Sequence, residues 1–204
     1  MKGGVAAMTV AAETLAELGV RLEGDLTVAT NTDEESSGAG GMALVDRGLR
    51  ADAGIVTEAT GGKVWVACRG SEYGTITVPG QTGHAEVQHG HWREGGAVNA
   101  IEKATIVIDA LRRLREDWRL QRRFEHPYLS KPDVVPTKVK AGEWSVTYPA
   151  DCVLTIACLY LPVQKDASGW GGDVKREVEA WVASAAASDP WLAEHPPVVR
   201  WFDN

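Results

Sequence analysis

The sequence predicts an α/β protein in two parts, and three observations indicate this. Residues 1–65 alternate between helical and strand-like apolar patterns, whereas residues 66–204 follow the order β-α-β-β-α-β of the ferredoxin-like plan. The first part opens directly on a helix and holds only two expected strands, which is too few for an independent core. We therefore expect residues 1–65 to be part of a larger parallel-sheet domain and residues 66–204 to form a complete domain.

The first part contains four expected elements. Apolar residues at helical spacing, interrupted by acidic residues, predict an amphipathic helix over Gly4–Leu18 and exclude a signal peptide. Alternating apolar residues predict strands over Leu26–Thr30 and Ala53–Thr57, and Gly40–Arg47 between them suits a short helix. This alternation is typical of a parallel sheet that is covered by helices.

The second part begins with two strand-like stretches, Val64–Gly70 and Tyr73–Gly80, which a polar, glycine-rich loop follows. Asn99 and Glu102 then have the spacing of a capping box at the start of a long helix. The apolar face of that helix consists of Ile101, Ala104, Ile108, Leu111, Leu114 and Trp118. Two further strands, a second helix and a last strand, "PPVVRWF", complete the order. The inward face of the second helix consists of Val174, Val178, Trp181 and Ala185.

Composition and charge exclude several classes of protein. No apolar run approaches the ~20 residues that a membrane-spanning helix needs, so we expect no membrane contact. The net charge of −7 argues against nucleic acid as a partner. Cys152 and Cys158 would lie too far apart on one strand for a disulfide, so with Cys68 they indicate reduced thiols in a cytoplasmic protein.

Two further patterns have both a functional and a structural interpretation. His89 and His91 stand two residues apart and could contact a metal, but we interpret them as part of a solvated loop. Six arginines near the end of the long helix could suggest nucleic acid. Acidic residues interrupt them, and cations complement the dipole at a helix carboxyl end, so we interpret them as a solvated helix end. They are Arg112, Arg113, Arg115, Arg119, Arg122 and Arg123.

The stretch "NTDEESSGAG" places three consecutive carboxylates, Asp33 to Glu35, between an expected strand and a glycine-rich turn. In open α/β sheets, ligands bind in the crevice at the carboxyl ends of the strands. Carboxylates this close repel one another unless water or cations stabilise them. The stretch is therefore either a solvated acidic turn or a metal site with an acid/base carboxylate beside it.

Four short stretches occur together in this chain. They are "MKGG" at the first helix, "TDEESSGAGG" after a strand, "ADAGIVTEATGG" with a strand that ends at Glu58, and "GQTGHA" in the second part. Together they resemble the acetylornithine deacetylase and succinyl-diaminopimelate desuccinylase family of two-metal hydrolases, which also includes carboxypeptidases and aminoacylases. The resemblance extends along essentially the whole chain.

The resemblance implies roles for individual residues. Glu34 matches the general base, and Glu35 and Glu58 match metal ligands. His84 matches a lid-domain histidine that enters the partner subunit's site and stabilises the oxyanion, while capping of its own loop is the alternative. The guanidinium of Arg69 could bind a substrate carboxylate, although an exposed strand end explains this residue equally.

The resemblance also implies an activity and an assembly. We expect hydrolysis of an amide bond in an N-acyl amino acid or small peptide, with two divalent metal ions, zinc or else cobalt or manganese. Residues 1–65 would be part of the catalytic domain, and residues 66–204 would be the lid, or dimerisation, domain of a homodimer. The alternative is a non-catalytic dimerisation or binding module that retains the hydrolase fold.

The chain also departs from the family's pattern. Family members have an Asp directly before Met-Lys-Gly-Gly, two histidine ligands, and a Pro where this chain has Ala59. Of five expected metal ligands, the chain carries only Glu35 and Glu58. We therefore expect an internal piece of such an enzyme that is inactive by itself.

Overall fold

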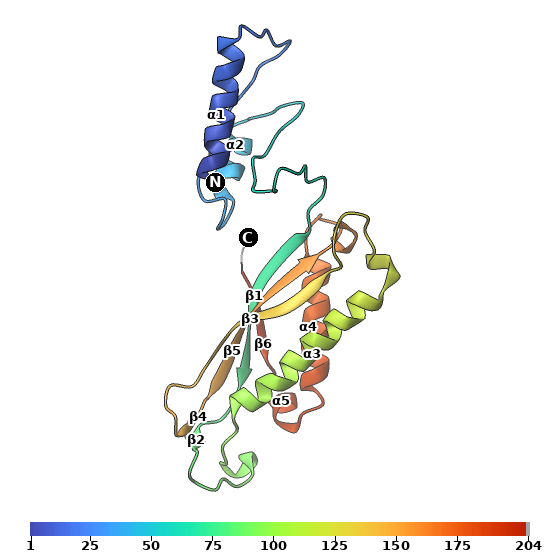
Figure 1. Cartoon of the computed structure of the whole chain (residues 1–204). Coiled ribbons are helices and arrows are strands. Elements are labelled where there is room, and N and C mark those ends of the chain that lie inside the picture. Colours follow the sequence, from blue (N-terminus) through green and yellow to red (C-terminus); the bar gives the residue numbers. More distant parts are fainter. Residues whose placement is uncertain (203–204) are drawn as a thin grey trace. The chain divides into compact units, whose positions relative to one another are not determined.

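The computed structural model describes residues 1–202, and the chain divides into two compact units between Trp65 and Val66. We call residues 1–65 unit 1 and residues 66–202 unit 2. Unit 1 contains two helices, α1 (Lys2–Glu17) and α2 (Ala39–Asp46), shown in Figure 1. Both predicted helices of unit 1 are thereby confirmed.

The two predicted strands of unit 1 are wrong. In residues 1–65, all of which the structure describes, no strand forms, so the expected parallel sheet is absent from this unit. Alternating apolar residues make a strand only when a neighbouring strand satisfies their backbone groups, and neither Leu26–Thr30 nor Ala53–Thr57 has such a partner. Their apolar side chains are accordingly exposed, Ile55 by 89% and Val56 by 82%.

Unit 2 contains six strands and three α-helices within the part of the chain that the structure describes. The strands are β1 (Gly70–Pro79), β2 (Gly83–His84), β3 (Asp133–Ala141), β4 (Thr147–Tyr148), β5 (Asp151–Tyr160) and β6 (Val198–Trp201). The α-helices are α3 (Ala100–Leu120), α4 (Gly172–Ala186) and α5 (Pro190–Glu194). Short 3-10 turns are η1 (Trp92–Glu94), η2 (Arg122–Phe124) and η3 (Pro162–Gln164).

Four of these strands form an antiparallel sheet in the order β3-β5-β1-β6, and β2 pairs with β4 in a small sheet of its own. The long strands and helices follow the order β-α-β-β-α-β that the sequence predicts, and the α/β class is confirmed. The separate strand predicted over Val64–Gly70 is wrong. One strand, β1, begins at Gly70, because only from there does the chain pair with β5.

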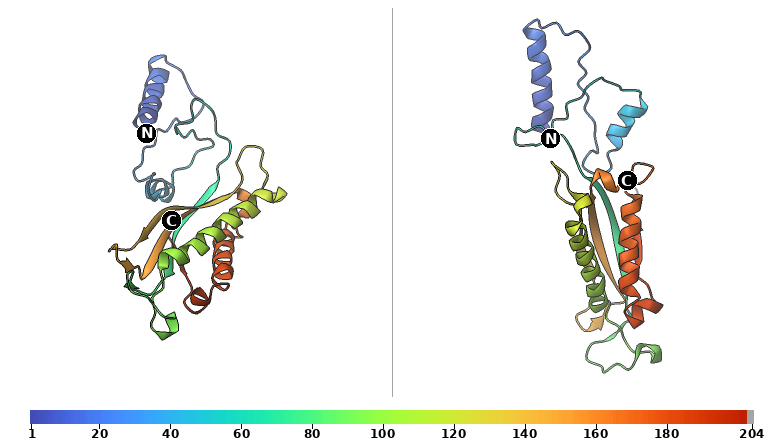
Figure 2. Two further views of the ribbon diagram at one scale, coloured as in Figure 1. Left: turned by 60° about the horizontal axis from the view of Figure 1, so that its bottom comes forward. Right: turned by 90° about the vertical axis from the view of Figure 1, so that its right-hand side faces the viewer.

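The core of unit 2 lies between the sheet and the helices α3 and α4, which pack against each other (Figure 2). The predicted face of α3 is largely correct, although Ile101 is 47% exposed. The cap at its start is also confirmed, because the Asn99 side chain accepts a hydrogen bond from the Ile101 amide at 2.9 Å.

The predicted inward face of α4 is correct only in its first half. Val174 and Val178 are buried, but the helix then buries Val182 and Ala186 rather than Trp181. Residues four apart lie on one face of a helix, so this face continues at a constant spacing and leaves the large indole at the rim.

Within residues 1–202, no helix is both long and apolar enough to cross a membrane.

Candidate functional site

The acidic turn of unit 1 is closed by its first carboxylate residue. Asp33 has a φ of 65°, in the left-handed region that Asp tolerates better than most residues. Its carbonyl oxygen accepts hydrogen bonds from the amides of Ser37 at 3.2 Å and Gly38 at 2.8 Å, and its carboxylate accepts one from the Ser37 hydroxyl. Asp33 therefore supports the turn, which leaves Glu34 and Glu35 on the outside of it.

Two glycines of the motifs are required by close packing against the backbone. A Cβ atom on Gly40 would overlap the carbonyl oxygen of Thr32, directly before the acidic turn. A Cβ atom on Gly4 would lie 2.5 Å from the carbonyl oxygen of Thr57, directly before Glu58. Each helix of unit 1 thus packs through a glycine against a segment that carries candidate site residues.

The three candidate glutamates of unit 1 are exposed. Glu34 and Glu35 lie in the turn before α2, and Glu58 lies after Thr57. Among residues 1–202, no group of three or more His, Cys, Asp or Glu side chains is arranged to hold a metal ion. A zinc ion needs three or four protein ligands, so Glu35 and Glu58 do not by themselves fit a two-metal centre.

His84 lies on β2, opposite Thr147 of β4. Its ring is exposed, and its Nδ1 accepts a hydrogen bond from the Glu86 amide at 3.3 Å. This contact is the loop cap that the sequence offers as one alternative. It also has a chemical consequence, because a neutral ring whose Nδ1 accepts carries its proton on Nε2. The exposed Nε2–H is then a hydrogen-bond donor.

The glycines of "GQTGHA" hold this histidine on a closely packed loop. A Cβ atom on Gly80 would lie 2.6 Å from the carbonyl oxygen of Val98 and 2.7 Å from that of Pro149. A Cβ atom on Gly83 would lie 2.6 Å from the ring of His89. Any larger residue would push the loop away from its supports, so the two glycines place His84 through close backbone approach.

Arg69 is half-buried just before β1, and its guanidinium donates a hydrogen bond to the Lys131 carbonyl oxygen at 3.3 Å. This bond holds the side chain against the segment that precedes β3. A role for Arg69 in binding a substrate carboxylate stays a prediction.

The remaining histidines make structural contacts. His89 Nε2 lies 2.9 Å from the His84 carbonyl oxygen, and His91 caps η1 by accepting a hydrogen bond from the Arg93 amide at 3.3 Å. His126 Nδ1 accepts hydrogen bonds from the two amides that follow its proline, at 3.1 and 3.2 Å. His195 stacks on a tryptophan of α5. These contacts agree with the structural interpretation of His89 and His91.

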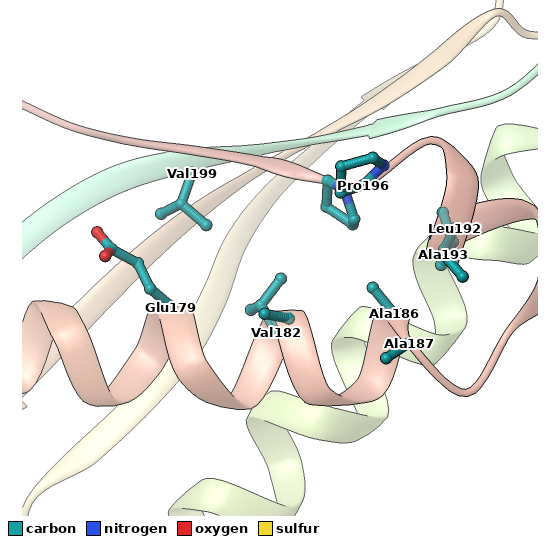
Figure 3. A pocket seen from close by; sticks show the side chains of 10 residues that line it. Glu179, Val182, Ala186, Ala187, Leu192, Ala193, Pro196 and Val199 are labelled. Carbon is teal, nitrogen blue, oxygen red and sulfur yellow. The ribbon is translucent and has the colours of Figure 1, made fainter.

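A groove of about 470 Å³ lies between α4, α5 and β6, and Figure 3 shows the side chains that line it. Its lining is mainly apolar and includes Val182, Ala186, Leu192, Pro196 and Val199, with Glu179 at one end. None of the candidate site residues lines this groove. It therefore forms no part of the candidate site.

Comparison with known proteins identifies the family. A model of Peptidase family M20/M25/M40 matches residues 1–204, and the chain belongs to this family. The resemblance to this family of deacylases and peptidases, which the four motifs indicate, is thereby confirmed. The family is one of metal-dependent hydrolases.

Two curated relatives illustrate the similarity. The N-formyl-4-amino-5-aminomethyl-2-methylpyrimidine deformylase of Halalkalibacterium halodurans is 29% identical over 205 residues, which cover 98% of this chain and 47% of that protein. The succinyl-diaminopimelate desuccinylase of Alkalilimnicola ehrlichii is 35% identical over 127 residues, which cover 57% of this chain and 32% of that protein. The chain thus spans about half the length of the deformylase, and its match to the desuccinylase covers about a third of that protein.

A solved structure has the same fold over the whole chain. The aminopeptidase PepT from Bacillus cereus matches with a TM-score of 0.59 and 18% sequence identity, over 100% of this chain and 47% of that one. At this identity the match concerns the fold alone.

Proposed function

We propose that the whole protein is a metal-dependent hydrolase that cleaves an amide bond of a small N-acyl substrate, such as an N-acyl amino acid, or of a small peptide. The observation that carries this proposal is the family match over residues 1–204. The deformylase and the desuccinylase are named for removing different acyl groups, so the shared chemistry is amide hydrolysis rather than recognition of one acyl group.

In this proposal Glu34 is the general base. It stands in an exposed turn that Asp33 and Gly40 hold in place, so its carboxylate is available to accept a proton from an attacking water. The neighbouring Glu35 and the more distant Glu58 would be ligands of divalent metal ions, with zinc favoured and cobalt or manganese as alternatives. Since two carboxylates cannot complete such a centre, we propose that the chain by itself is inactive.

His84 would donate a hydrogen bond to the oxyanion that forms when water attacks the amide carbonyl. Its exposed ring and the protonated Nε2 that its Nδ1 contact favours both support this role. In a homodimer formed through unit 2, this histidine would serve the partner subunit's site. The sheet of unit 2 offers the edge strands β3 and β6 for such pairing.

The second candidate function is a non-catalytic dimerisation or binding module. The specific observation in its favour is that no metal-binding group of three or more side chains is assembled within residues 1–202.

One experiment separates these functions. Metal content per chain is measured after dialysis, for the whole protein and for residues 1–204, together with assays on N-formyl and N-succinyl amines and dipeptides. We expect tightly held metal and chelator-sensitive turnover in the whole protein, and neither in residues 1–204. Stoichiometric metal with turnover in the 204-residue chain would contradict its proposed inactivity and would implicate other ligands, such as His89 and His91. Absence of both from the whole protein would favour the binding module.

A further inference from the structure

Three aromatic rings outside the sequence motifs pack together in unit 2. Trp191 of α5 and His195, which follows that helix, are stacked with ring centroids 3.7 Å apart and planes inclined by 16°. Trp92 of η1 presents a T-shaped contact to both rings, at 5.3 Å from Trp191 and 5.7 Å from His195. Such edge-to-face arrangements are favourable because a ring's positive edge meets the negative face of another. We call these three residues the aromatic clamp.

The same short helix makes two further contacts with the chain around His84. The buried Trp191 donates a hydrogen bond from its Nε1 to the Pro79 carbonyl oxygen at 2.9 Å, immediately before the first glycine of "GQTGHA". Arg93 forms an ion pair with Glu194, and its guanidinium lies 4.7 Å from the centroid of the Trp92 ring. Helix α5 therefore contacts the chain on both sides of His84, at Pro79 and at Trp92 with Arg93.

The segment between these two supports also makes contacts of its own. The ring of His89 contacts the His84 carbonyl oxygen and occupies the space that a side chain on Gly83 would need. Gln81 and Val98 exchange two backbone hydrogen bonds, of 2.8 and 2.9 Å, which close the base of the loop. A displacement of Trp92 would therefore act on a loop whose base is closed and in which the His89 ring contacts the His84 backbone.

We propose that the aromatic clamp is a positioning device for His84, and that Trp92 is its principal positioning residue. This inference rests on the proposed role of His84 as the oxyanion donor. Trp92 acts through the loop and does not itself touch the substrate. A displacement of a donor by about 1 Å can cost on the order of a hundredfold in rate, so a loop that three aromatic side chains hold in place favours catalysis.

The test compares three variants of residues 1–204, namely Trp92→Ala, Trp92→Phe and the control Trp170→Ala. Trp170 is 69% exposed and is not part of the clamp. Amide hydrogen exchange over residues 81–98 and the NMR resonances of the His84 ring are measured. Because Trp92→Ala removes both edge-to-face interactions, we expect it to accelerate exchange in this loop by about tenfold and to shift the ring resonances. Trp92→Phe should restore most of the protection, and Trp170→Ala should match the original chain.

The proposal is overturned if Trp92→Ala leaves both loop exchange and the His84 resonances unchanged. If that variant loses the whole fold of unit 2, His195→Ala replaces it, because this change removes one ring of the clamp while the buried Trp191 remains. We then expect loop exchange to accelerate by about threefold, and an unchanged loop would again overturn the proposal.

These readouts need no turnover, so they are independent of the proposed hydrolase function. In an active whole protein, Trp92→Ala should lower kcat with little change in KM, because the oxyanion forms only during reaction. An inactive whole protein whose loop still depends on Trp92 would contradict the function and leave the clamp intact. An active whole protein in which Trp92→Ala leaves loop exchange and the His84 resonances unchanged would contradict the clamp alone.

Discussion

Gly4 of α1 lies close against the segment before Glu58: a Cβ atom on Gly4 would lie 2.5 Å from the Thr57 carbonyl oxygen. The adjacent Gly3 has nothing within 4 Å of its Cβ position, although both glycines lie in the same helix. The two glycines of "MKGG" therefore differ in their surroundings, because a side chain would clash at Gly4 and would be accommodated at Gly3. Only Gly4 is required by packing.

The pair makes a matched test of unit 1. In a helix interior, replacing an unhindered glycine by alanine stabilises by about 0.5–1 kcal/mol. Gly3 lies in the first turn of α1, so Gly3→Ala should raise the stability of unit 1 by no more than this amount. Gly4→Ala gains the same helix propensity but forces the helix off Thr57, and overpacking of this kind costs about 1–3 kcal/mol. Amide exchange in α1 should accordingly slow in Gly3→Ala and quicken in Gly4→Ala. Equal behaviour of the two variants would mean that α1 does not depend on this contact.

In the whole protein, substitutions of the two adjacent glutamates should have different effects. Glu34→Gln keeps the shape of the side chain but cannot accept a proton, so turnover should nearly vanish while metal content is retained. Glu35→Gln should instead lower metal occupancy, because an amide is a poorer ligand for a divalent ion than a carboxylate. Metal analysis and an amidase assay on both variants decide the matter. A reversed outcome would exchange the two proposed roles.

Unit 2 should associate with itself. The sheet edges at β3 and β6 leave backbone groups available for a second chain, and a homodimer of C2 symmetry would pair the same surface from each copy. Sedimentation of the chain at micromolar concentrations should show a dimer that weakens on dilution. A monomer throughout that concentration range would count heavily against the proposed assembly.

The three thiols should differ in reactivity. Burial, with smaller contributions from Glu72 and Asp133, raises the pKa of Cys158 to about 12. Burial also raises the pKa of Cys152, whereas Cys68 is exposed. A thiol-specific reagent at neutral pH should therefore modify Cys68 readily, and the two thiols of β5 only after unfolding. Rapid modification of all three in the folded chain would contradict the burial of β5.

The same shift has a consequence for stability. An unfolded cysteine has a pKa of about 8.5, so above that pH the unfolded chain gains a thiolate while folded Cys158 stays protonated up to about 12. The contribution of Cys158 is therefore fully present below about pH 8.5 and is lost as the pH rises toward 12. Denaturant unfolding of Cys158→Ala should show a weaker loss of stability over this alkaline range than the original chain does.

The helices and the family were readable from the sequence because their signals are local. The spacing of apolar residues indicates α1 and α3, Asn99 marks the start of α3, and four short motifs identify the family. The order β-α-β-β-α-β follows from the same periodicities. None of these inferences requires knowledge of which distant segments meet.

Only the tertiary structure decided which of those segments pair. Leu26–Thr30 has the pattern of a strand, yet no other segment of unit 1 pairs with it. Without the hydrogen bonds of a partner strand, the segment does not form a β-strand. Contacts between residues that are distant in the sequence also cannot be predicted from the spacing of apolar residues. Examples are the contacts of Gly4 with Thr57 and of Trp92 with Trp191. Periodicity reports the side that a residue faces, whereas hydrogen-bond partners and ring contacts depend on where the rest of the chain lies.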